Sequence, residues 1–321
     1  MNEFTPTTER FEEKLSENVS SFRYVAFDTE TTGVDIHRDH LVELAAVAFD
    51  EEFEHRHFEE FARPPIAIPA GAGAVHGITD EMVQSAASGA EVIGRFFEFL
   101  KTAGSPRVLL AHNCGFDLGI ISGECARATP TLRGGLDSDP KSLPKNLSEN
   151  LSEYGAEIVL DTCVMARSLL PNLERHRLQD LGAYFKVKPP AQYHRAMADV
   201  EVLRQSFLGL LGLAADRYTL PGGGLTLNTL VNIAGGYFLF DPQKASKQKL
   251  NFQLSPLLQS LQNLCGSEAR VGIMYGLEED YRYITPIELQ TKSSRVYLKA
   301  LCHRENIKKT FRADRILKIA L

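Results

Sequence analysis

The sequence predicts an α/β domain followed by a smaller, β-rich domain. With 321 residues, the chain exceeds the roughly 100–200 residues of a typical domain, so each part is long enough to bury its own core. Short β-prone runs alternate with helical patterns up to residue 213, whereas residues 270–321 hold only short strands separated by polar turns. Between them, Pro221 and the glycines at 222–224 interrupt the helical pattern, which places a boundary there.

Composition excludes several classes of protein. Hydrophobic residues make up 44% and charged residues 24% of the chain, and the mean hydropathy of -0.16 excludes a mostly disordered protein. No segment approaches the ~18 uninterrupted apolar residues that span a bilayer, and the acidic first residues do not match a signal or transit peptide. We therefore expect a cytoplasmic protein without membrane contact. The five cysteines lack metal or disulfide spacing, so most are expected to be buried, reduced thiols.

The net charge of -6 conceals an asymmetry along the chain. Residues 242–321 carry 14 Lys and Arg against 7 Asp and Glu, a net charge of +7, whereas the residues before them carry 21 against 34, a net charge of -13. Acidic regions often approach phosphate through metal ions, and basic regions often bind phosphate directly. The asymmetry therefore hints at a partner that contains phosphate.

Local patterns predict each element of the first domain, which is expected to follow a polar N-terminal extension at residues 1–21. Alternating or continuous apolar runs predict strands, apolar residues at helical spacing predict helices, and segments rich in Pro, Gly or Asp predict loops. The strands are expected at residues 24–27, 41–49, 53–61, 108–111 and 158–160, the helices at 91–101, 116–127, 162–169, 177–185 and 196–213, and the loops at 63–77 and 132–152, the second of them a flexible insertion.

The first domain is expected to span residues 22–215, followed by a linker at 216–224 and a second domain at 225–321. Within the second domain, short β-prone runs separated by polar turns are typical of a small β-barrel. These runs lie at residues 270–274, 281–289, 295–302 and 308–311.

A pair of carboxylates lies at the end of the first predicted strand. The period of two in a strand puts Asp28 and Glu30 on the same face. Two carboxylates so placed repel each other unless a cation lies between them, and hard oxygen ligands suit Mg²⁺ or Mn²⁺. Taken alone, such a pair is more often solvated surface. The motif therefore needs further acids nearby before it indicates a metal site.

Two later segments supply further acids. Asp117 begins a predicted helix directly after the strand at 108–111, where its alternative role is to complement the positive helix end. His194 and Asp199 are five residues apart at the start of another helix, near enough to serve one site if the chain turns from loop into helix between them. A lone histidine before a helix is more often a polar loop residue. Together with the first pair, these residues are hard to explain as independent accidents.

These three segments, in this order, resemble the three motifs of the DnaQ-like, or DEDDh, 3′–5′ exonucleases, over about residues 22–210. The resemblance implies an RNase H-like fold, with a central mixed sheet flanked by helices. It also implies that Asp28, Glu30, Asp117 and Asp199 bind two divalent metal ions, Mg²⁺ or Mn²⁺, and that His194 is the histidine of the DEDDh name. Further matching segments are Val75 to Thr79, Asp161-Thr162, Ala166-Arg167, Leu169 to Pro171 and His176 to Leu178.

The residue types also fit phosphodiester hydrolysis independently of the resemblance. Two metal ions can flank the charged phosphodiester, one generating the nucleophile and the other stabilising the leaving 3′-oxygen. A histidine with an unperturbed pKa near ~6.5 can take a proton from the attacking water at neutral pH. A tyrosine in this place would define a sister branch of the family. Tyr193 precedes His194, but the spacing to Asp199 selects His194.

Several residues near these motifs are candidates for substrate binding. Thr31 could contact the terminal nucleotide, although a role in stabilising the turn is about as plausible. His76, Asn113 and Phe116 could line the substrate groove, with Phe116 as a stacking surface for a base and ordinary packing as its alternative. His176 opens a predicted helix and is expected to anchor it, because His194 already provides the base.

The basic end of the chain, residues 270–321, resembles a WYL domain, which is built as a small Sm-like or SH3-like β-barrel. Val296 stands where the family has tryptophan, and the chain contains no tryptophan, which puts ligand stacking at that position in doubt. The resemblance implies a pocket for nucleic acid or a nucleotide that includes Tyr297, Lys309, Arg312 and Arg315. Lys and Arg interleaved with aromatic residues are also typical of a single-strand binding surface. The alternative is a solvated barrel in which Arg315 pairs with an aspartate.

We therefore expect a metal-dependent 3′–5′ exonuclease that acts on the 3′ ends of single-stranded DNA, or of RNA, with a C-terminal module that binds nucleic acid or a regulatory ligand. One alternative is a polymerase-associated proofreading subunit, which should carry a polymerase-binding tail in place of the WYL-like barrel. The other is a ligand-sensing regulator that uses the nuclease domain as a scaffold. Four converging acids argue against the scaffold, which has no use for them.

Overall fold

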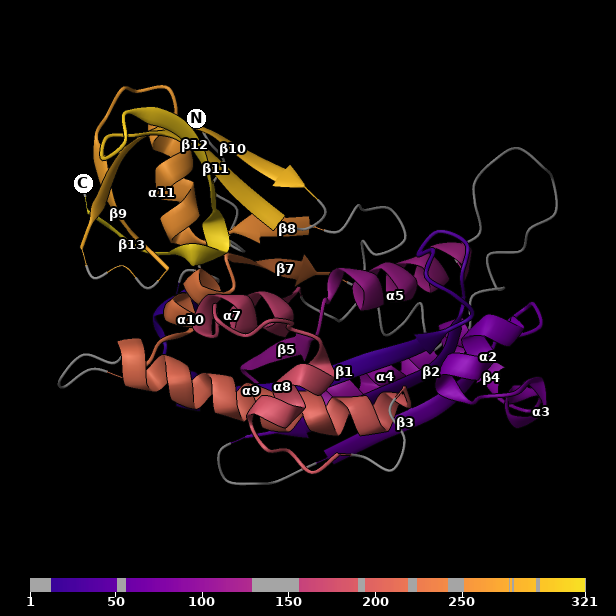
Figure 1. Ribbon diagram of the computed structural model, residues 1–321. Coiled ribbons are helices and arrows are strands. Elements are labelled where there is room, and N and C mark those ends of the chain that lie inside the picture. Colours follow the sequence, from indigo (N-terminus) through magenta and orange to yellow (C-terminus); the bar gives the residue numbers. More distant parts are fainter. Residues whose placement is uncertain are drawn as a thin grey trace, which may run out of the picture.

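A mixed β-sheet lies at the centre of the first part of the protein (Figure 1). The computed structural model describes residues 13–50, 56–128, 156–189, 194–218, 224–241, 251–276, 278, 280–292 and 295–320. The strands of this sheet are β1 (Arg23–Thr31), β2 (Leu41–Phe49), β3 (Arg56–Arg63), β4 (Ala87–Ser88), β5 (Arg107–Ala111), β6 (Glu157–Asp161), β7 (Gly236–Phe240) and β8 (Asn251–Leu254). Among the described residues their order is β4-β3-β2-β1-β5-β6-β7-β8. β1 pairs antiparallel with β2 and parallel with β5, so the sheet is mixed, as predicted.

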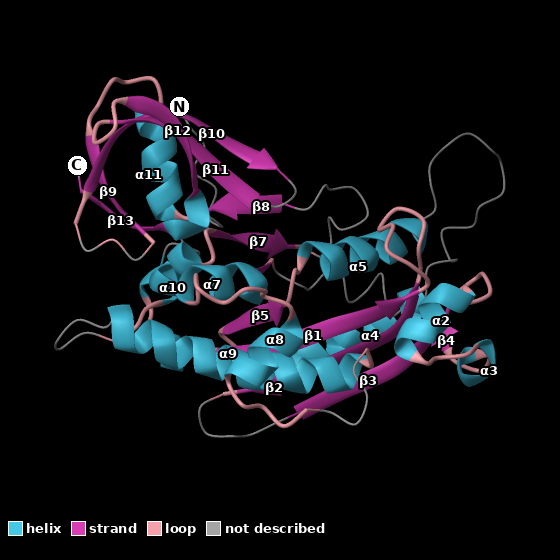
Figure 2. Ribbon diagram, viewed as in Figure 1, coloured by secondary structure: helices cyan, strands magenta, loops and turns pink. Residues whose placement is uncertain are grey.

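Helices cover both faces of the sheet (Figure 2). They are α2 (Ala70–His76), α3 (Asp80–Val83), α4 (Gly89–Thr102), α5 (Gly115–Ala128), α7 (Thr162–Leu169), α8 (Leu178–Tyr184), α9 (Ala196–Tyr218) and α10 (Leu227–Ile233), preceded by the 3-10 turn η1 (Val19–Ser21). Alternation along β1 separates two cores: Tyr24 and Ala26 pack with residues of α7, α8 and α9, whereas Val25 and Phe27 pack with residues of α4 and α5. Every residue of β2 is buried, as expected for a strand covered on both faces.

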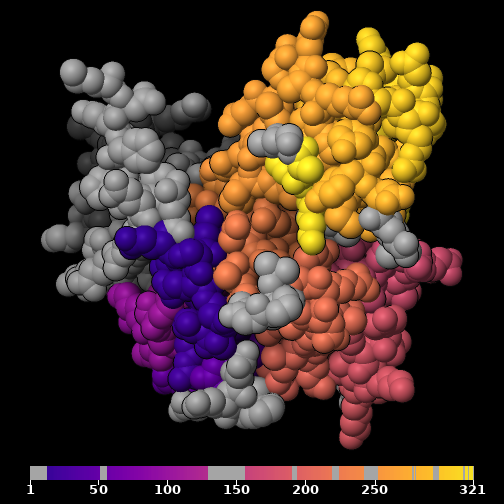
Figure 3. Space-filling view, turned by 90° about the vertical axis from the view of Figure 1, so that its left-hand side faces the viewer, coloured from indigo at the N-terminus to yellow at the C-terminus, as the bar shows by residue number. Residues whose placement is uncertain are grey.

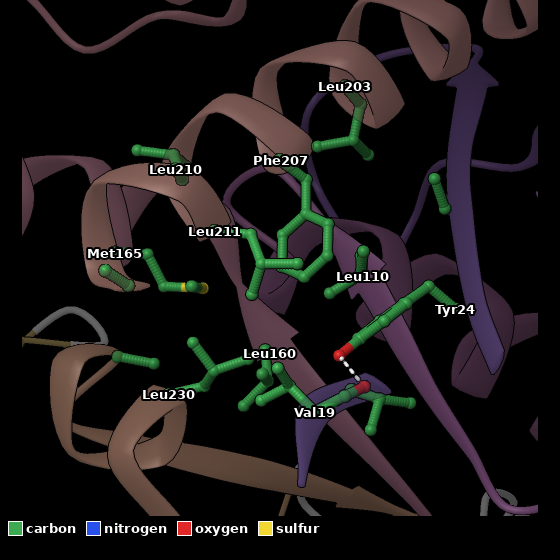
Figure 4. Packing of buried hydrophobic residues seen from close by; sticks show 14 of the residues in the cluster. Val19, Tyr24, Leu110, Leu160, Met165, Leu203, Phe207, Leu210, Leu211 and Leu230 are labelled. Carbon is green, nitrogen blue, oxygen red and sulfur yellow. Dashed lines mark hydrogen bonds between the residues drawn. The ribbon is translucent and has the colours of Figure 1, made fainter. Parts of the chain in front are cut away.

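The core beneath α9 fixes this helix against the sheet (Figure 4). Tyr24 of β1 packs against Phe207 of α9, with 4.8 Å between the ring centroids. The hydroxyl of Tyr24 donates to the carbonyl oxygen of Val19 at 2.8 Å, so the polar end of this buried ring has a partner. Burial on this face therefore holds the long helix that carries His194 and Asp199 at its start.

One predicted loop contains a helix. The composition of residues 63–77 predicts a loop, but α2 runs from Ala70 to His76 and ends at Gly77, whose φ of 72° is left-handed. The N–H of Gly77 donates to the carbonyl of Gly73, which caps the helix. Glycine inside a helix costs only about 1 kcal/mol relative to alanine, so this cap and the burial of His76 can override the composition. The predicted insertion at 132–152 lies outside the described residues.

A second, smaller sheet forms the C-terminal part of the chain (Figure 1). Its elements are β9 (Val271–Tyr275), β10 (Arg282–Lys292), β11 (Arg295–Cys302), β12 (Ile307–Arg312), the 3-10 turn η3 (Ala313–Arg315) and β13 (Ile316–Ala320), preceded by α11 (Pro256–Leu264). The described strands are antiparallel in the order β12-β11-β10-β9-β13, and Leu258 and Leu261 of α11 pack into their core. The predicted closed barrel is not confirmed, because β12 and β13 are the edges of the sheet among the described residues.

The segment between the two sheets extends the first one. β7 pairs antiparallel with β6, β8 pairs with β7, and Phe238 and Phe240 enter the core beneath α4. The start of the described chain also contacts this region: the N–H of Val19 donates to the carbonyl of Leu225 at 2.9 Å. Figure 3 shows these early residues, in indigo, beside the orange segment. The division at 216–224 stays a proposal, and β7 and β8 extend the first sheet.

Two expectations from composition concern the whole molecule. All five cysteines are free thiols, and Cys265 is the one that is only half-buried, so most are buried and reduced, as predicted. Across the described ranges, no helix is both long enough and apolar enough to cross a membrane.

Candidate active site

The four predicted metal ligands come from three elements that meet at one end of β1. Asp28 and Glu30 lie on β1, two residues apart, and the alternation of a strand directs both to the same face. Asp117 lies in the first turn of α5, and Asp199 lies in the first turn of α9. Both helices contact β1, so the fold brings the four acids together.

Asp117 is tied directly to the strand that carries the first two acids. Its Oδ1 accepts hydrogen bonds from the backbone N–H of Thr29 at 3.1 Å and from the Thr29 hydroxyl at 2.7 Å. Thr29 lies between Asp28 and Glu30, and its side chain points away from theirs because strand residues alternate. These two bonds fix Asp117 against β1.

Asp199 and His194 are joined across the start of α9. The backbone N–H of His194 donates to Oδ2 of Asp199 at 3.2 Å. Ligand atoms of Glu30, His194 and Asp199 all lie within 4.8 Å of one another. His194 is exposed and has a φ of 59°, in the left-handed region. The structure therefore places the predicted base beside two of the predicted metal ligands.

The electrostatics of the acids follow from burial and mutual repulsion. Burial, followed by the carboxylates of Asp117, Glu30 and Asp199, raises the pKa of Asp28 well above its usual range. Burial and neighbouring acids raise the pKa of Glu30 to about 8. Burial raises the pKa of Asp117 to about 7, although its bonds with Thr29 lower it, and burial also raises the pKa of Asp199. Burial and crowding thus favour the protonated form of these four carboxyl groups when no cation is bound.

This cluster fits a divalent cation. Carboxylate oxygens are hard ligands of the kind that Mg²⁺ and Mn²⁺ prefer, and a nearby cation removes the repulsion that raises the pKa values. Across the described residues, Glu30, His194 and Asp199 form the one group of three or more acids, histidines or cysteines close enough to hold a metal ion. The ligand atoms and the raised pKa values of the acids are therefore both consistent with a metal site.

Two predicted substrate-binding residues, Thr31 and His76, lie beside the acids. The hydroxyl of Thr31 donates to the carbonyl oxygen of Gly33 at 2.5 Å, which is the turn-stabilising alternative. Nδ1 of His76 accepts the N–H of Ile78 at 3.0 Å. Burial lowers the pKa of His76, and a hydrogen bond with the backbone of Thr31 acts in the opposite direction. His76 therefore links α2 to the end of β1.

The other two, Asn113 and Phe116, lie at the start of α5 near Asp117. Asn113 has a φ of 67°, and its backbone N–H donates to Oδ1 of Asp161 at 3.1 Å. Phe116 is half-buried and packs against the core beneath α4 and α5. His176, expected to anchor a helix, holds its chain segment through a contact between Nε2 and the carbonyl oxygen of Leu170 at 2.9 Å.

Sequence reasoning missed Glu43 and Arg195, which lie beside the acids. Glu43 is wholly buried in β2, paired in the ladder with Glu30, and forms an ion pair with Arg195. A signal was present, because Glu43 is the single charged residue in an apolar run of nine. Its partner, 152 positions later, follows from no local pattern.

The structure brings only part of the predicted C-terminal pocket together. Tyr297 of β11 lies opposite Arg312 of β12, and the N–H of Arg312 donates to the hydroxyl of Tyr275. Arg315 follows in η3, and its buried Nε has no hydrogen-bond partner among the described residues. Lys309 lies further along β12 and donates to Glu305 at 2.6 Å. The aspartate proposed as an alternative partner of Arg315 has no described side chain at position 314.

Comparison with known families agrees with this geometry. The sequence profile of the exonuclease family RNase_T matches residues 25–207, a span that contains the four acids and His194. The chain belongs to this exonuclease family. Its members are hydrolases, so the protein is an enzyme of that class. The profile of the WYL domain matches residues 256–321, and this span begins with α11, earlier than the predicted resemblance.

Relatives of this exonuclease include components of DNA polymerase III. DNA polymerase III subunit epsilon of Treponema pallidum is 32% identical over 190 residues, which cover 59% of this chain and 76% of that protein. DNA polymerase III PolC-type of Caldanaerobacter subterraneus is 31% identical over 188 residues, which cover 59% of this chain but 11% of that protein. The chain therefore matches most of the epsilon subunit and a small part of the PolC-type polymerase.

Solved structures show the fold of this exonuclease. A structure of exonuclease I has a TM-score of 0.54 and 15% sequence identity, and the match covers 93% of this chain and 64% of that one. Exonuclease I from Methylocaldum szegediense has a TM-score of 0.53 and 16% identity, with 93% and 64% covered. At this identity the likeness concerns the fold alone, and it confirms the predicted RNase H-like arrangement.

Proposed function

We propose that this exonuclease is a divalent-metal-dependent 3′–5′ enzyme that removes nucleotides from single-stranded nucleic acid, DNA in preference to RNA. The observation that carries the proposal is the convergence of Asp28, Glu30, Asp117 and Asp199 beside His194. Structures of exonuclease I with single-stranded DNA and with a dA16 oligonucleotide share the fold, at a TM-score of 0.51, which supports a single-stranded substrate. The proposal places the enzyme in the cytoplasm.

The four acids would hold two ions, Mg²⁺ or Mn²⁺. When bound, such ions lower the pKa of water and neutralise charge on the phosphate. The chain itself contributes the placement of the ligands. Thr29 holds Asp117 through two hydrogen bonds, and the backbone of His194 holds Asp199.

His194 would serve as the general base. A water oxygen attacks the phosphorus of the last phosphodiester, and the bond from phosphorus to the 3′-oxygen of the preceding nucleotide breaks. An imidazole nitrogen of His194 takes the proton of the water, and the departing 3′-oxygen takes a proton from solvent. The product is a nucleoside 5′-monophosphate. The exposure of His194 beside Glu30 and Asp199 supports this role, because the base must reach both water and substrate.

The terminal nucleotide would lie against Thr31, His76, Asn113 and Phe116. Thr31 and His76 lie on one side of the acids, at the end of β1 and in α2, and Asn113 and Phe116 lie near Asp117 at the start of α5. The ring of Phe116 packs partly into the core, so only its outer part could stack on a base.

The C-terminal part would bind the strand upstream of its 3′ end, or a regulatory ligand. Its support is the net charge of +7 over residues 242–321 together with exposed aromatic side chains. Arg270 lies 4.6 Å from the ring centroid of Tyr283, which is 46% exposed. Tyr297 and Arg312 lie opposite each other on neighbouring strands. Basic and aromatic side chains therefore lie side by side at two places on or beside this sheet.

A proofreading subunit is a second candidate function, because the epsilon subunit of DNA polymerase III is a relative at 32% identity. The two candidates share their chemistry and differ in partner. A proofreading enzyme should co-purify with a DNA polymerase at equal stoichiometry. An independent exonuclease should not, although both should remove a frayed, mismatched 3′ nucleotide faster than a paired one.

The direct test is digestion of 5′-labelled oligonucleotides. DNA and RNA, each single- and double-stranded, are incubated with Mg²⁺, Mn²⁺ or a chelator. The expected result is a ladder of shortened, still labelled products from single-stranded DNA, and none with the chelator. Release of labelled mononucleotide at the start of digestion, or full activity with the chelator, would contradict the proposal.

A further inference from the structure

Glu43 is a charged residue in a place where charge is costly. It lies in the middle of β2 with 0% exposure, opposite Glu30 in the ladder. Its Oε1 accepts a hydrogen bond from Nη2 of Arg195 at 2.8 Å, and its Oε2 accepts from Nε of Arg195 at 3.2 Å and from the backbone N–H of Ala196 at 2.9 Å. A buried carboxylate is tolerated when it is paired and hydrogen-bonded in this way.

Arg195 connects this buried acid to the start of α9. Both of its bonding nitrogens face Glu43, and its guanidinium lies 5.4 Å from the ring centroid of Phe61 in β3. A planar guanidinium suits two such interactions at once. The carbonyl of Arg195 accepts the N–H of Asp199 at 3.0 Å. Arg195 is therefore held by two strands and is bonded to a predicted metal ligand.

His194 immediately precedes this anchor. Its φ of 59° is unfavourable for a residue with a side chain, so the surrounding structure must hold the turn. Two features are available to do so: the bond from the N–H of His194 to Asp199, and the fixed position of Arg195. The exposed His194 side chain itself packs little, so its direction depends on the backbone.

We propose that the ion pair of Glu43 and Arg195 is a positioning device that directs His194 toward Glu30 and Asp199. The inference rests on the proposed function, in which His194 takes the proton of the attacking water. A general base must lie within about 2.6–3.2 Å of its proton donor. Misplacement by about 1 Å can cost about 100-fold in rate. Loss of the ion pair should therefore lower kcat, because the side chain of His194 would no longer be held in position.

The test compares Arg195→Met with a matched control, Arg204→Met on the same helix. Nε of Arg204 donates to Glu201 at 2.9 Å, and its guanidinium lies 6.0 Å from the ring centroid of Phe49. The control therefore removes the same two kinds of interaction away from the site. kcat, KM and the melting temperature are measured for both variants, for His194→Ala and for the double variant His194→Ala with Arg195→Met, on a short single-stranded DNA with Mn²⁺.

Arg195→Met should lower kcat by about 10–100-fold with KM within about twofold, and Arg204→Met should change neither. In the His194→Ala background, Arg195→Met should add no further loss, because both changes remove one function. An unchanged kcat, a rise in KM alone, or the same factor in both backgrounds would overturn the proposal. If the ion pair were purely structural, Arg195→Met would lower the melting temperature and would lower kcat by the same factor with and without His194.

Arg195→Lys covers the case in which Arg195→Met does not fold. It keeps the charge but cannot bond Glu43 at two points, so it should lower kcat about tenfold, again only when His194 is present. Wild-type kcat in Arg195→Lys would then overturn the inference. Failure of the proposed function has a different signature, since His194→Ala would itself retain wild-type kcat.

Discussion

The catalytic end of the first sheet and the second sheet use charge in opposite ways. In the first, acids from β1, α5 and α9 are drawn together at least partly out of water, and hydrogen bonds tie Asp117 to Thr29 and Asp199 to His194. In the second, charged side chains lie along the surface in pairs such as Lys299 with Glu288 and Lys309 with Glu305. Exposed pairs of this kind contribute about 0–1 kcal/mol each.

The first site should depend on the exact position of each charged group, whereas the second surface should depend on its total charge. Under the proposed function, one misplaced carboxylate should disable the first site, because its neighbours would share the same cation. One missing lysine should change binding at the second surface by a single increment, because a strand of phosphates would respond to total charge. Single substitutions should therefore have large effects at the first site and graded effects at the second.

The largest effect is expected for Asp28→Ala. A metal ion supplies several kcal/mol of transition-state stabilisation, and each 1.36 kcal/mol is tenfold in rate, so kcat should fall by at least about 10³-fold. Glu81→Ala, an exposed acid on α3, is the control and should keep wild-type turnover. Steady-state digestion of single-stranded DNA measures both. A fully active Asp28→Ala enzyme would refute the metal site.

His194→Ala should come next. General base catalysis contributes about 10²–10⁴-fold, so kcat should fall within that range. Binding of Mn²⁺, measured by calorimetry, should stay near the wild-type value, because the four carboxylates are intact. If His194→Ala kept wild-type turnover at neutral pH, another group would have to accept the proton of the attacking water.

Changes on the second sheet should act on affinity and leave the chemistry intact. Tyr297→Ala and Arg312→Gln should weaken binding of a long single strand, the first by removing about 1–3 kcal/mol of base stacking. Arg312→Gln should make the slope of log affinity against log salt concentration less steep by about 0.7, because one phosphate of the single strand is no longer neutralised. Fluorescence anisotropy measures both quantities, and kcat on a short oligonucleotide should be unchanged.

Lys101→Gln, on α4 of the first part, is the control for these variants. Equal affinity and equal salt slope in all of the variants would end the nucleic-acid role of the second sheet. The second sheet would then be expected to bind a protein or a small ligand.

The smallest effect is a dependence of metal-free stability on pH. The pKa of Glu30 rises from 4.5 to about 8 on folding, so the folded protein holds this proton more tightly than the unfolded chain does. The contribution of Glu30 to stability without metal should therefore be fully present below about pH 4.5 and be lost as the pH rises toward 8. Glu30→Gln should raise the melting temperature at pH 8 by a few degrees and have little effect at pH 4.5, as measured by scanning calorimetry.

Saturating Mn²⁺ should remove this difference in the wild-type enzyme, because the cation binds the folded carboxylates. A difference in melting temperature between Glu30→Gln and wild type that stays the same from pH 4.5 to 8 without metal would contradict the raised pKa of Glu30.

Local patterns predicted most of the fold. The bounds of β2, α7 and β11 coincide with the predicted runs, because continuous apolar or helical spacing is visible within a few residues. α2 was hidden by its glycines. Motif order predicted the convergence of the acids and His194, and the structure brings ligand atoms of Glu30, His194 and Asp199 within 4.8 Å of one another.

What escaped prediction depends on distant parts of the chain. Glu43 and Arg195 come together because α9 packs on β2, and no local sequence pattern predicts this ion pair. The same holds for β7 and β8, whose place in the first sheet follows from the pairing of β7 with β6 and of β8 with β7. Sequence spacing identifies chemistry within a motif, whereas contacts between motifs require the tertiary fold.

The pairing of β7 with β6 has a consequence during synthesis of the protein. The ribosome delivers β6 at residues 157–161 well before β7 at 236–240, so a nascent chain exposes the unpaired backbone of β6 for that interval. An exposed strand edge is a template for pairing with another chain. Translational arrest before residue 254 should leave an exonuclease part that binds chaperones or aggregates, although the four acids proposed as metal ligands have already been made.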